Sequence, residues 1–104
     1  MIIVTTPDLP GREIAEVLGL VYGNTVRARH VGKDIQALFK NIAGGEIDHY
    51  TKLLAESREQ SIDRIIEQAK SKGADAIIAF RFGTSEIATG AAEILAYGTA
   101  VKLK

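Results

Sequence analysis

The residue type in this chain that most readily binds a metal ion is histidine, and the sequence has two of them. His49 is expected on the polar face of a helix, where a second ligand would have to lie three or four residues away. Among those positions only Glu46 carries a carboxylate, and His30 has none within two residues. We therefore expect surface histidines, with a divalent metal site only where neighbouring copies supply further ligands.

A double glycine, Gly44-Gly45, precedes the longest helical segment, where backbone amides could hold an anion. A phosphate loop needs a preceding strand and a following Lys-Ser/Thr pair, and the sequence has neither. Gly44 also suits the position just after a helix, because glycine accepts the left-handed conformation found there. The pair is interpreted as a helix joint, with anion binding as the alternative.

Arg58 is predicted to project into the apolar face of the long helix, beside Leu54, Ser61 and Ile65. One interpretation is structural: its stem packs along apolar neighbours while its head reaches a carboxylate or carbonyls at a subunit contact. The other interpretation is an anion-binding residue, and the sequence leaves both open.

No arrangement for covalent catalysis is evident. Ser57, Ser61 and Ser85 have no histidine partner in a nucleophile pattern. The absence of cysteine excludes disulfides, thiolate ligands and cysteine nucleophiles. We expect no catalytic residues and no enzyme activity.

Charge and hydropathy limit the partners. The chain has 13 basic and 13 acidic residues, so it lacks the basic excess of a general nucleic-acid binder. No apolar run approaches the roughly 20 residues of a membrane span, and the first residues lack the layout of a signal peptide. We expect a single cytoplasmic domain with no nucleic-acid or membrane partner and no resident cofactor.

A helix followed by a β-hairpin dominates the second half of the chain. Residues 47–72 contain no Pro or Gly and are rich in helix-forming types, which predicts one long helix. Gly73 is expected as its C-terminal cap. Residues 74–82 and 93–103 have strand composition, with the turn between them at Thr89-Gly90.

The first half is predicted to begin with a short strand at residues 2–6. Residues 15–31 are interpreted as a long strand, kinked or bulged at Gly19 and Gly23. A short helix over residues 12–18 is the alternative, which periodicity alone does not exclude.

A second helix is predicted at residues 35–43, with Asp34 as its N-cap and Gly44 after its last residue. The fold class is therefore α+β, with a long helix packed on a small antiparallel sheet.

The strands of the hairpin have two rather apolar faces. The strand at residues 74–82 is expected to direct four apolar side chains to one side: Ala76, Ile78, Phe80 and Phe82. The strand at residues 93–103 is expected to direct Leu95, Tyr97, Thr99, Val101 and Leu103 to one side. Its other side is expected to carry Ile94, Ala96, Gly98 and Ala100. A sheet with a single helical layer usually has a polar outer face, so a second apolar face indicates a cover. The simplest cover is another copy of the chain, which predicts a homo-oligomer.

Several stretches, taken together, resemble the YbjQ family, which is labelled as heavy-metal-binding. They are Thr5-Thr6-Pro7, residues 19–23, Gly44-Gly45 with Tyr50, Leu53, Ser57-Arg58 and Ile66, residues 72–78, and residues 98–101. The likeness covers nearly the whole chain.

The resemblance implies a dodecin-like subunit that assembles into a ring, with a pentamer as the expected form, and it implies no established biochemical function. Arg58 matches a family arginine. Soft heavy metals prefer Cys and Met ligands, and this chain has no Cys and only Met1. The resemblance therefore supports an oligomer better than it supports metal binding.

The leading hypothesis is a non-enzymatic homo-oligomeric domain that binds a small ligand between subunits. The alternative is a metal-binding or metal-handling module that uses His49, Glu46 and carboxylates of neighbouring subunits, with His30 as a further candidate. A third hypothesis is an enzyme whose site lies at the subunit interface.

Overall fold

The structure is a computed structural model that describes residues 1–28 and 46–104. Side chains are described for residues 1–26 and 51–104. The predicted helix at residues 35–43 lies outside the described residues, so it stays a prediction.

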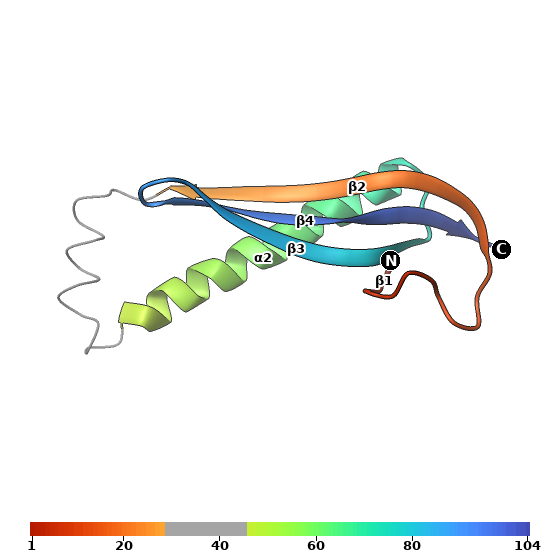
Figure 1. The fold of residues 1–104 in the computed structure, drawn as a ribbon, viewed down its shortest axis with the longest axis horizontal. Helices are drawn as coiled ribbons and strands as arrows, with labels where there is room; N and C mark the ends of the chain where they lie inside the picture. Colours follow the sequence, from red (N-terminus) through yellow and green to blue (C-terminus); the bar gives the residue numbers. More distant parts are fainter. Residues whose placement is uncertain (29–45) are drawn as a thin grey trace.

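The described chain forms β1 (Ile2–Ile3), β2 (Ile14–Ala28), α2 (Glu46–Ser71), β3 (Ala76–Ala88) and β4 (Ala91–Leu103). The strands form one sheet in the order β1-β3-β4-β2, and α2 crosses one face of it (Figure 1). β1 pairs with β3 in parallel, and the other neighbours are antiparallel. The α+β class is confirmed, while the expectation of an entirely antiparallel sheet is wrong at β1.

The C-terminal end of α2 is fixed by glycine. Gly73 takes a φ of +76°, its N–H donates to the carbonyl of Lys70 at 2.9 Å, and the N–H of Ala74 donates to the carbonyl of Ala69 at 3.0 Å. This pair of bonds is the Schellman motif. The predicted cap is confirmed, and it turns the chain directly into β3.

β2 is the predicted long strand, and the alternative helix at residues 12–18 is wrong. The register of β2 against β4 shifts between Val17 and Gly19, where Gly19 has a φ of +103°. Gly23 was also expected to kink the strand, but it pairs in register with Ala96. Of the two glycines, Gly19 therefore marks a bulge, and a second register shift lies between Ile14 and Glu16.

Gly23 is where α2 approaches β2. A Cβ atom at Gly23 would lie 2.4 Å from the carbonyl oxygen of Ser61 and 2.6 Å from the amide nitrogen of Ile65. Beside it, the hydroxyl of Thr25 donates to the carbonyl of Ser57 at 3.2 Å, and the hydroxyl of Ser61 donates to the same carbonyl at 3.0 Å. All three hydroxyl residues are buried. Small, internally hydrogen-bonded side chains thus allow helix and strand to pack closely.

β3 contains a bulge that the sequence pattern did not reveal. Ala79 has a φ of +52°, and the register against β4 shifts between Ile78 and Arg81. The N–H groups of Ala79 and Phe80 both turn toward the N-terminal segment, donating to the carbonyls of Thr6 at 2.8 Å and Val4 at 3.0 Å. The strict alternation expected along this strand is therefore wrong, because the bulge moves Phe80 to the other face.

Two apolar clusters show the result. The cluster beneath α2 contains Val21, Ile65, Ala69, Ile77, Phe80, Ala96 and Ala100. The cluster on the opposite face contains Leu9, Ala76, Ile78 and Val101, with Val4, Ile14 and Leu103 packed against it. The faces expected for β4 and the turn at Thr89-Gly90 agree with the structure. The N-terminal segment therefore covers one end of the sheet face that α2 leaves open.

Replacing Gly23 by Ala is expected to lower the free energy of unfolding by about 1–3 kcal/mol, because the methyl group would overlap the α2 backbone. Gly83→Ala is the matched control, since the nearest atom to a Cβ there is 3.9 Å away, in the ring of Tyr97. Urea denaturation measures both variants. Equal stability of the two would contradict the close approach of α2.

Candidate functional site

The sheet face away from α2, which we call the outer face, carries exposed apolar side chains. Tyr22 in β2 lies directly opposite Tyr97 in β4. Their neighbours Val21 and Ala96 are in the cluster beneath α2, so alternation directs the tyrosines outward. Tyr22 is 50% exposed, Tyr97 38% and Leu20 63%. These residues form the uncovered part of the sheet.

The bulge at Gly19 adds another apolar side chain to this face. Val17 pairs with Val101, which belongs to the outer cluster, whereas Leu18 packs against the cluster beneath α2. Val17 and Leu20 therefore share the outer face although they are three residues apart. The bulge extends the apolar surface along β2.

A shallow hollow of about 360 Å³ lies at the centre of the outer face, lined by Leu20, Tyr22, Leu95 and Tyr97. Gly83 in β3 adjoins the ring of Tyr97. The lining of the hollow is apolar, so the hollow suits an apolar side chain or ring rather than an ion.

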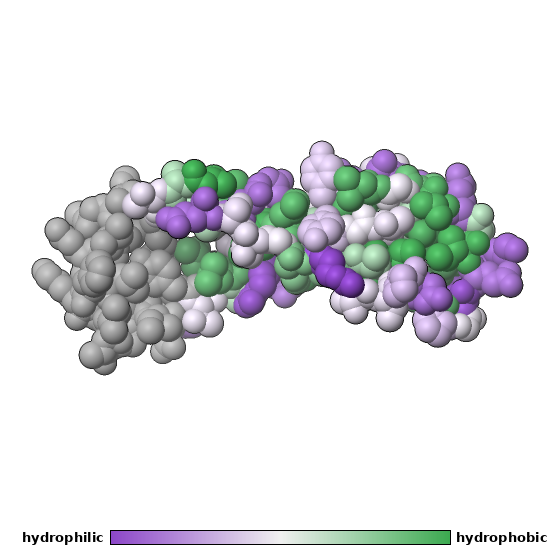
Figure 2. Space-filling view, in the orientation of Figure 1, coloured by the Kyte–Doolittle hydropathy of each residue, from purple (hydrophilic) through white to green (hydrophobic). Residues whose placement is uncertain are grey.

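Polar groups beside the hollow are paired within the chain. The side-chain amide of Asn24 donates to a carboxylate oxygen of Glu93 at 3.2 Å. Arg81 donates to the carbonyls of Thr5 at 2.9 Å and Phe80 at 2.8 Å. Figure 2, which views the sheet with α2 behind it, shows apolar side chains in separate patches on this face, most densely toward the end where the chain termini lie, with polar groups between them.

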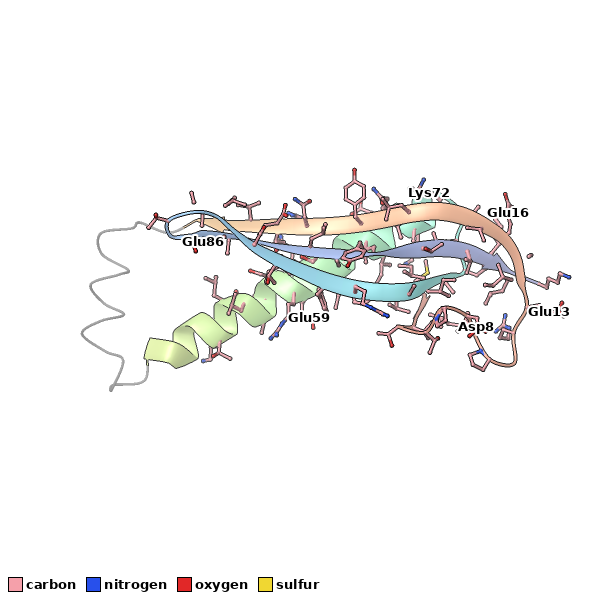
Figure 3. The ribbon with its side chains drawn as sticks, in the orientation of Figure 1. Asp8, Glu13, Glu16, Glu59, Lys72 and Glu86 are labelled. Atoms are coloured by element: carbon pink, nitrogen blue, oxygen red, sulfur yellow. The ribbon has the colours of Figure 1, made fainter. Side chains whose placement is uncertain are left out.

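Carboxylates are dispersed over the described residues. Figure 3 shows Glu86 near the β3–β4 turn, Glu59 on α2, and Glu13 and Glu16 at the far end of β2. Among the side chains of residues 1–26 and 51–104, no three His, Asp or Glu residues are grouped to hold a metal ion. The part of the chain that is described therefore offers no metal centre within one copy.

The predicted metal and anion residues are only partly placed. His30, Gly44 and Gly45 lie outside the described residues. The backbone of Glu46 and His49 belongs to the first turn of α2, where a spacing of three residues puts them on one side of the helix. Their side chains lie outside the described set, so their ligand role stays a prediction.

Arg58 is exposed, so the prediction that it projects into the apolar face of α2 is wrong within one copy. The residues of α2 that are buried against the sheet are Ser57, Ser61, Ile65 and Ala69, a single row at intervals of four. Arg58 lies about 100° around the helix from Ser57. Leu54, which was also expected on the buried face, is 46% exposed.

The sequence reasoning considered Ser57 and Ser61 only as candidate nucleophiles, and it missed their part in helix packing. Both are fully buried and bond to backbone carbonyls, Ser57 to that of Leu53 at 2.9 Å. The sequence signal for this packing role was the spacing: Ser57 and Ser61 are four residues apart, and Ile65 follows four residues later. Residues at this spacing lie on one side of a helix.

Comparison with known proteins gives the family. The family model described as "YbjQ_1: Putative heavy-metal-binding" matches residues 1–104. The chain belongs to the YbjQ family. Among its relatives is a UPF0145 protein of Archaeoglobus fulgidus, 58% identical over 104 residues, covering 100% of this chain and 96% of the relative. A UPF0145 protein of Photobacterium profundum is 60% identical over 103 residues, covering 99% and 100%.

A solved structure from Pediococcus pentosaceus has a similar fold. It is described as a protein with unknown function of the DUF74 family, and it aligns with a TM-score of 0.69 at 18% identity. The alignment covers 100% of this chain and 98% of that chain. At this identity the likeness supports the fold alone. None of the helices within residues 1–28 and 46–104 is long and apolar enough to cross a membrane.

The orientation of α2 can be tested with two adjacent residues. Arg58→Met is expected to change the free energy of unfolding by less than about 0.5 kcal/mol, because the side chain is exposed. Ser57→Val is expected to cost about 1–3 kcal/mol, because it adds volume at a fully buried site and removes a hydroxyl. Thermal unfolding measures both. Greater destabilisation by Arg58→Met would place Arg58, not Ser57, against the sheet.

Proposed function

We propose that this protein is a non-enzymatic subunit of a homo-oligomer and that its outer face is buried against another copy. The exposed apolar row of the outer face carries the proposal: Val17, Leu20 and Tyr22 on β2 and Tyr97 on β4. Fully burying a large apolar side chain contributes about 1.5–3 kcal/mol. Several half-exposed residues on one face therefore favour association.

The shape of the subunit supports the same proposal. The chain has an accessible surface of 6701 Å², against about 5700 Å² for a compact monomer of this mass. Its extents are 55 × 22 × 16 Å. A flat, elongated subunit of these extents has a broad face that exceeds the roughly 800 Å² that each partner buries in a stable interface.

The finer part of the proposal is a ring of dodecin-like subunits with five members. The resemblance to the YbjQ family supports this ring. The N-terminal segment covers only one end of the outer face, which suits a head-to-tail contact between subunits. A small apolar ligand would then lie in the hollow lined by Leu20, Tyr22, Leu95 and Tyr97. Exposed Arg58 would contact a neighbouring subunit or an anion, as would the Gly44-Gly45 joint.

Leu20→Lys is expected to convert the assembly to monomers at micromolar concentration, because it puts a charge into the buried centre of the contact. Ile87→Lys is the matched control, because Ile87 is 55% exposed near the β3–β4 turn, away from the hollow. Light scattering coupled to size exclusion gives the masses. A monomeric wild type would refute the proposal, and dissociation by Ile87→Lys alone would place the contact elsewhere.

The rival function is metal binding or handling, and the description of the family favours it. Within one copy, Glu46 and His49 share a side of the first turn of α2, and two ligands from one copy would need completion by neighbours. His30 is the other candidate. This rival places the ligand set between subunits as well.

Equilibrium dialysis with Zn²⁺, Ni²⁺ and Cu²⁺ distinguishes the two functions. We expect no stoichiometric binding, because two histidines with one carboxylate at helix spacing fall short of the three or four protein ligands of a zinc-type site. Stoichiometric binding that is lost in the His30→Ala/His49→Ala variant would establish the metal function instead. Arg58→Ala is a control that leaves both histidines and Glu46 in place.

A further inference from the structure

Among the strands of residues 1–28 and 46–104, β2 lies at the edge of the sheet, with β4 on one side and none of these strands on the other. An edge strand presents unpaired N–H and C=O groups on alternate residues, and a strand of another molecule can pair with them. β2 is 15 residues long, which is long for an exposed edge. Such an edge promotes uncontrolled sheet extension unless something occupies it.

Two side chains of α2 occupy the middle of this edge. The side-chain oxygen of Gln68 accepts the backbone N–H of Tyr22 at 2.8 Å. The guanidinium of Arg64 donates to the backbone carbonyl of Asn24. Tyr22 and Asn24 are two residues apart, so both groups face the same side of the strand. α2 thus supplies one acceptor and one donor, which in a pairing strand would come from two different residues.

The packing of α2 holds these side chains at the edge. Arg64 and Gln68 are four residues apart on the helix and flank the buried residue Ile65. The close approach of α2 at Gly23 brings the turn that carries Arg64 next to β2, where a Cβ on Gly23 would lie 2.9 Å from the Cβ of Arg64. Arg64 and Gln68 also line a groove between β2 and α2.

We propose that the edge of β2 is a strand-pairing surface for a second copy of this chain, and that Arg64 and Gln68 keep it closed. Removing both side chains exposes the N–H of Tyr22 and the carbonyl of Asn24 to β2 of another copy. β2-to-β2 pairing uses the one free side of β2 in each copy, so it joins copies in pairs. The proposal does not depend on the outer face being an interface.

Hydrogen exchange of the Tyr22 amide tests the bond directly. In Gln68→Ala the amide should exchange about tenfold faster than in the wild type, as expected for the loss of one hydrogen bond. Gln68→Glu keeps an acceptor oxygen and should exchange at the wild-type rate. An unchanged rate in Gln68→Ala would overturn the proposal, because the N–H would then be protected by something else.

The Arg64→Ala/Gln68→Ala variant tests the consequence. We expect native-like circular dichroism and a concentration-dependent rise in mass to twice that of the wild type, measured by light scattering coupled to size exclusion. The control Glu67→Ala/Lys70→Ala changes exposed residues of the same helix turns that make no bond to β2 in the described structure. The Arg64→Lys/Gln68→Glu variant retains a donor and an acceptor, so its mass should equal that of the wild type.

An equal mass for the double-alanine variant and the Glu67→Ala/Lys70→Ala control would refute the proposal that Arg64 and Gln68 block the edge of β2. The readouts separate this proposal from the one above. Leu20→Lys acts on the outer face and lowers the oligomer mass, whereas loss of Arg64 and Gln68 raises it. A wild type that is monomeric and a double-alanine variant that dimerises would refute the outer-face interface and support the closed edge.

Discussion

The close contact between α2 and β2 at Gly23 is the constraint on which the other features depend. A side chain at this position would overlap the backbone of the helix, so the absence of a Cβ sets how near α2 can lie. The buried hydroxyls of Thr25, Ser57 and Ser61 fill the remaining space and satisfy one another or backbone carbonyls. Because α2 lies this close to β2, Arg64, which is next to Gly23, can donate to the backbone carbonyl of Asn24 at the edge of the strand. One glycine thus couples the packing of the core to the state of the sheet edge.

Two bulges decide which residues face solvent. The bulge at Gly19 lets Val17 and Leu20 share the outer face, and the bulge at Ala79 transfers Phe80 into the cluster beneath α2. A bulge adds one residue to one strand, so every later side chain moves to the opposite face. The apolar surface of the outer face is therefore a product of register as well as of composition.

The sequence predicted the elements with strong local signals and failed where tertiary contacts decide. The ends of α2 followed from the absence of Pro and Gly within it and from Gly73 after it. The bulge at Ala79 has no local signal, because alanine rarely takes a positive φ and is held there by bonds to the N-terminal segment. The exposure of Arg58 was missed for a related reason: a helical wheel gives relative angles, and the narrow row that contacts the sheet is set by the small residues of β2.

The outer face and the closed edge together restrict how copies of this chain can meet. Contact through the outer face buries a bounded apolar area and leaves the strand edges of each copy unpaired, so the number of subunits is set by the geometry of that face. Contact through the edge of β2 would be made by backbone groups that every β-strand presents, so it would not select its partner by side-chain chemistry. Arg64 and Gln68 remove the second route with two hydrogen bonds that α2 supplies from within the same chain. In the proposed assembly, the apolar surface that would bind a copy and the backbone edge that Arg64 and Gln68 bond lie on adjacent sides of the same strand, β2.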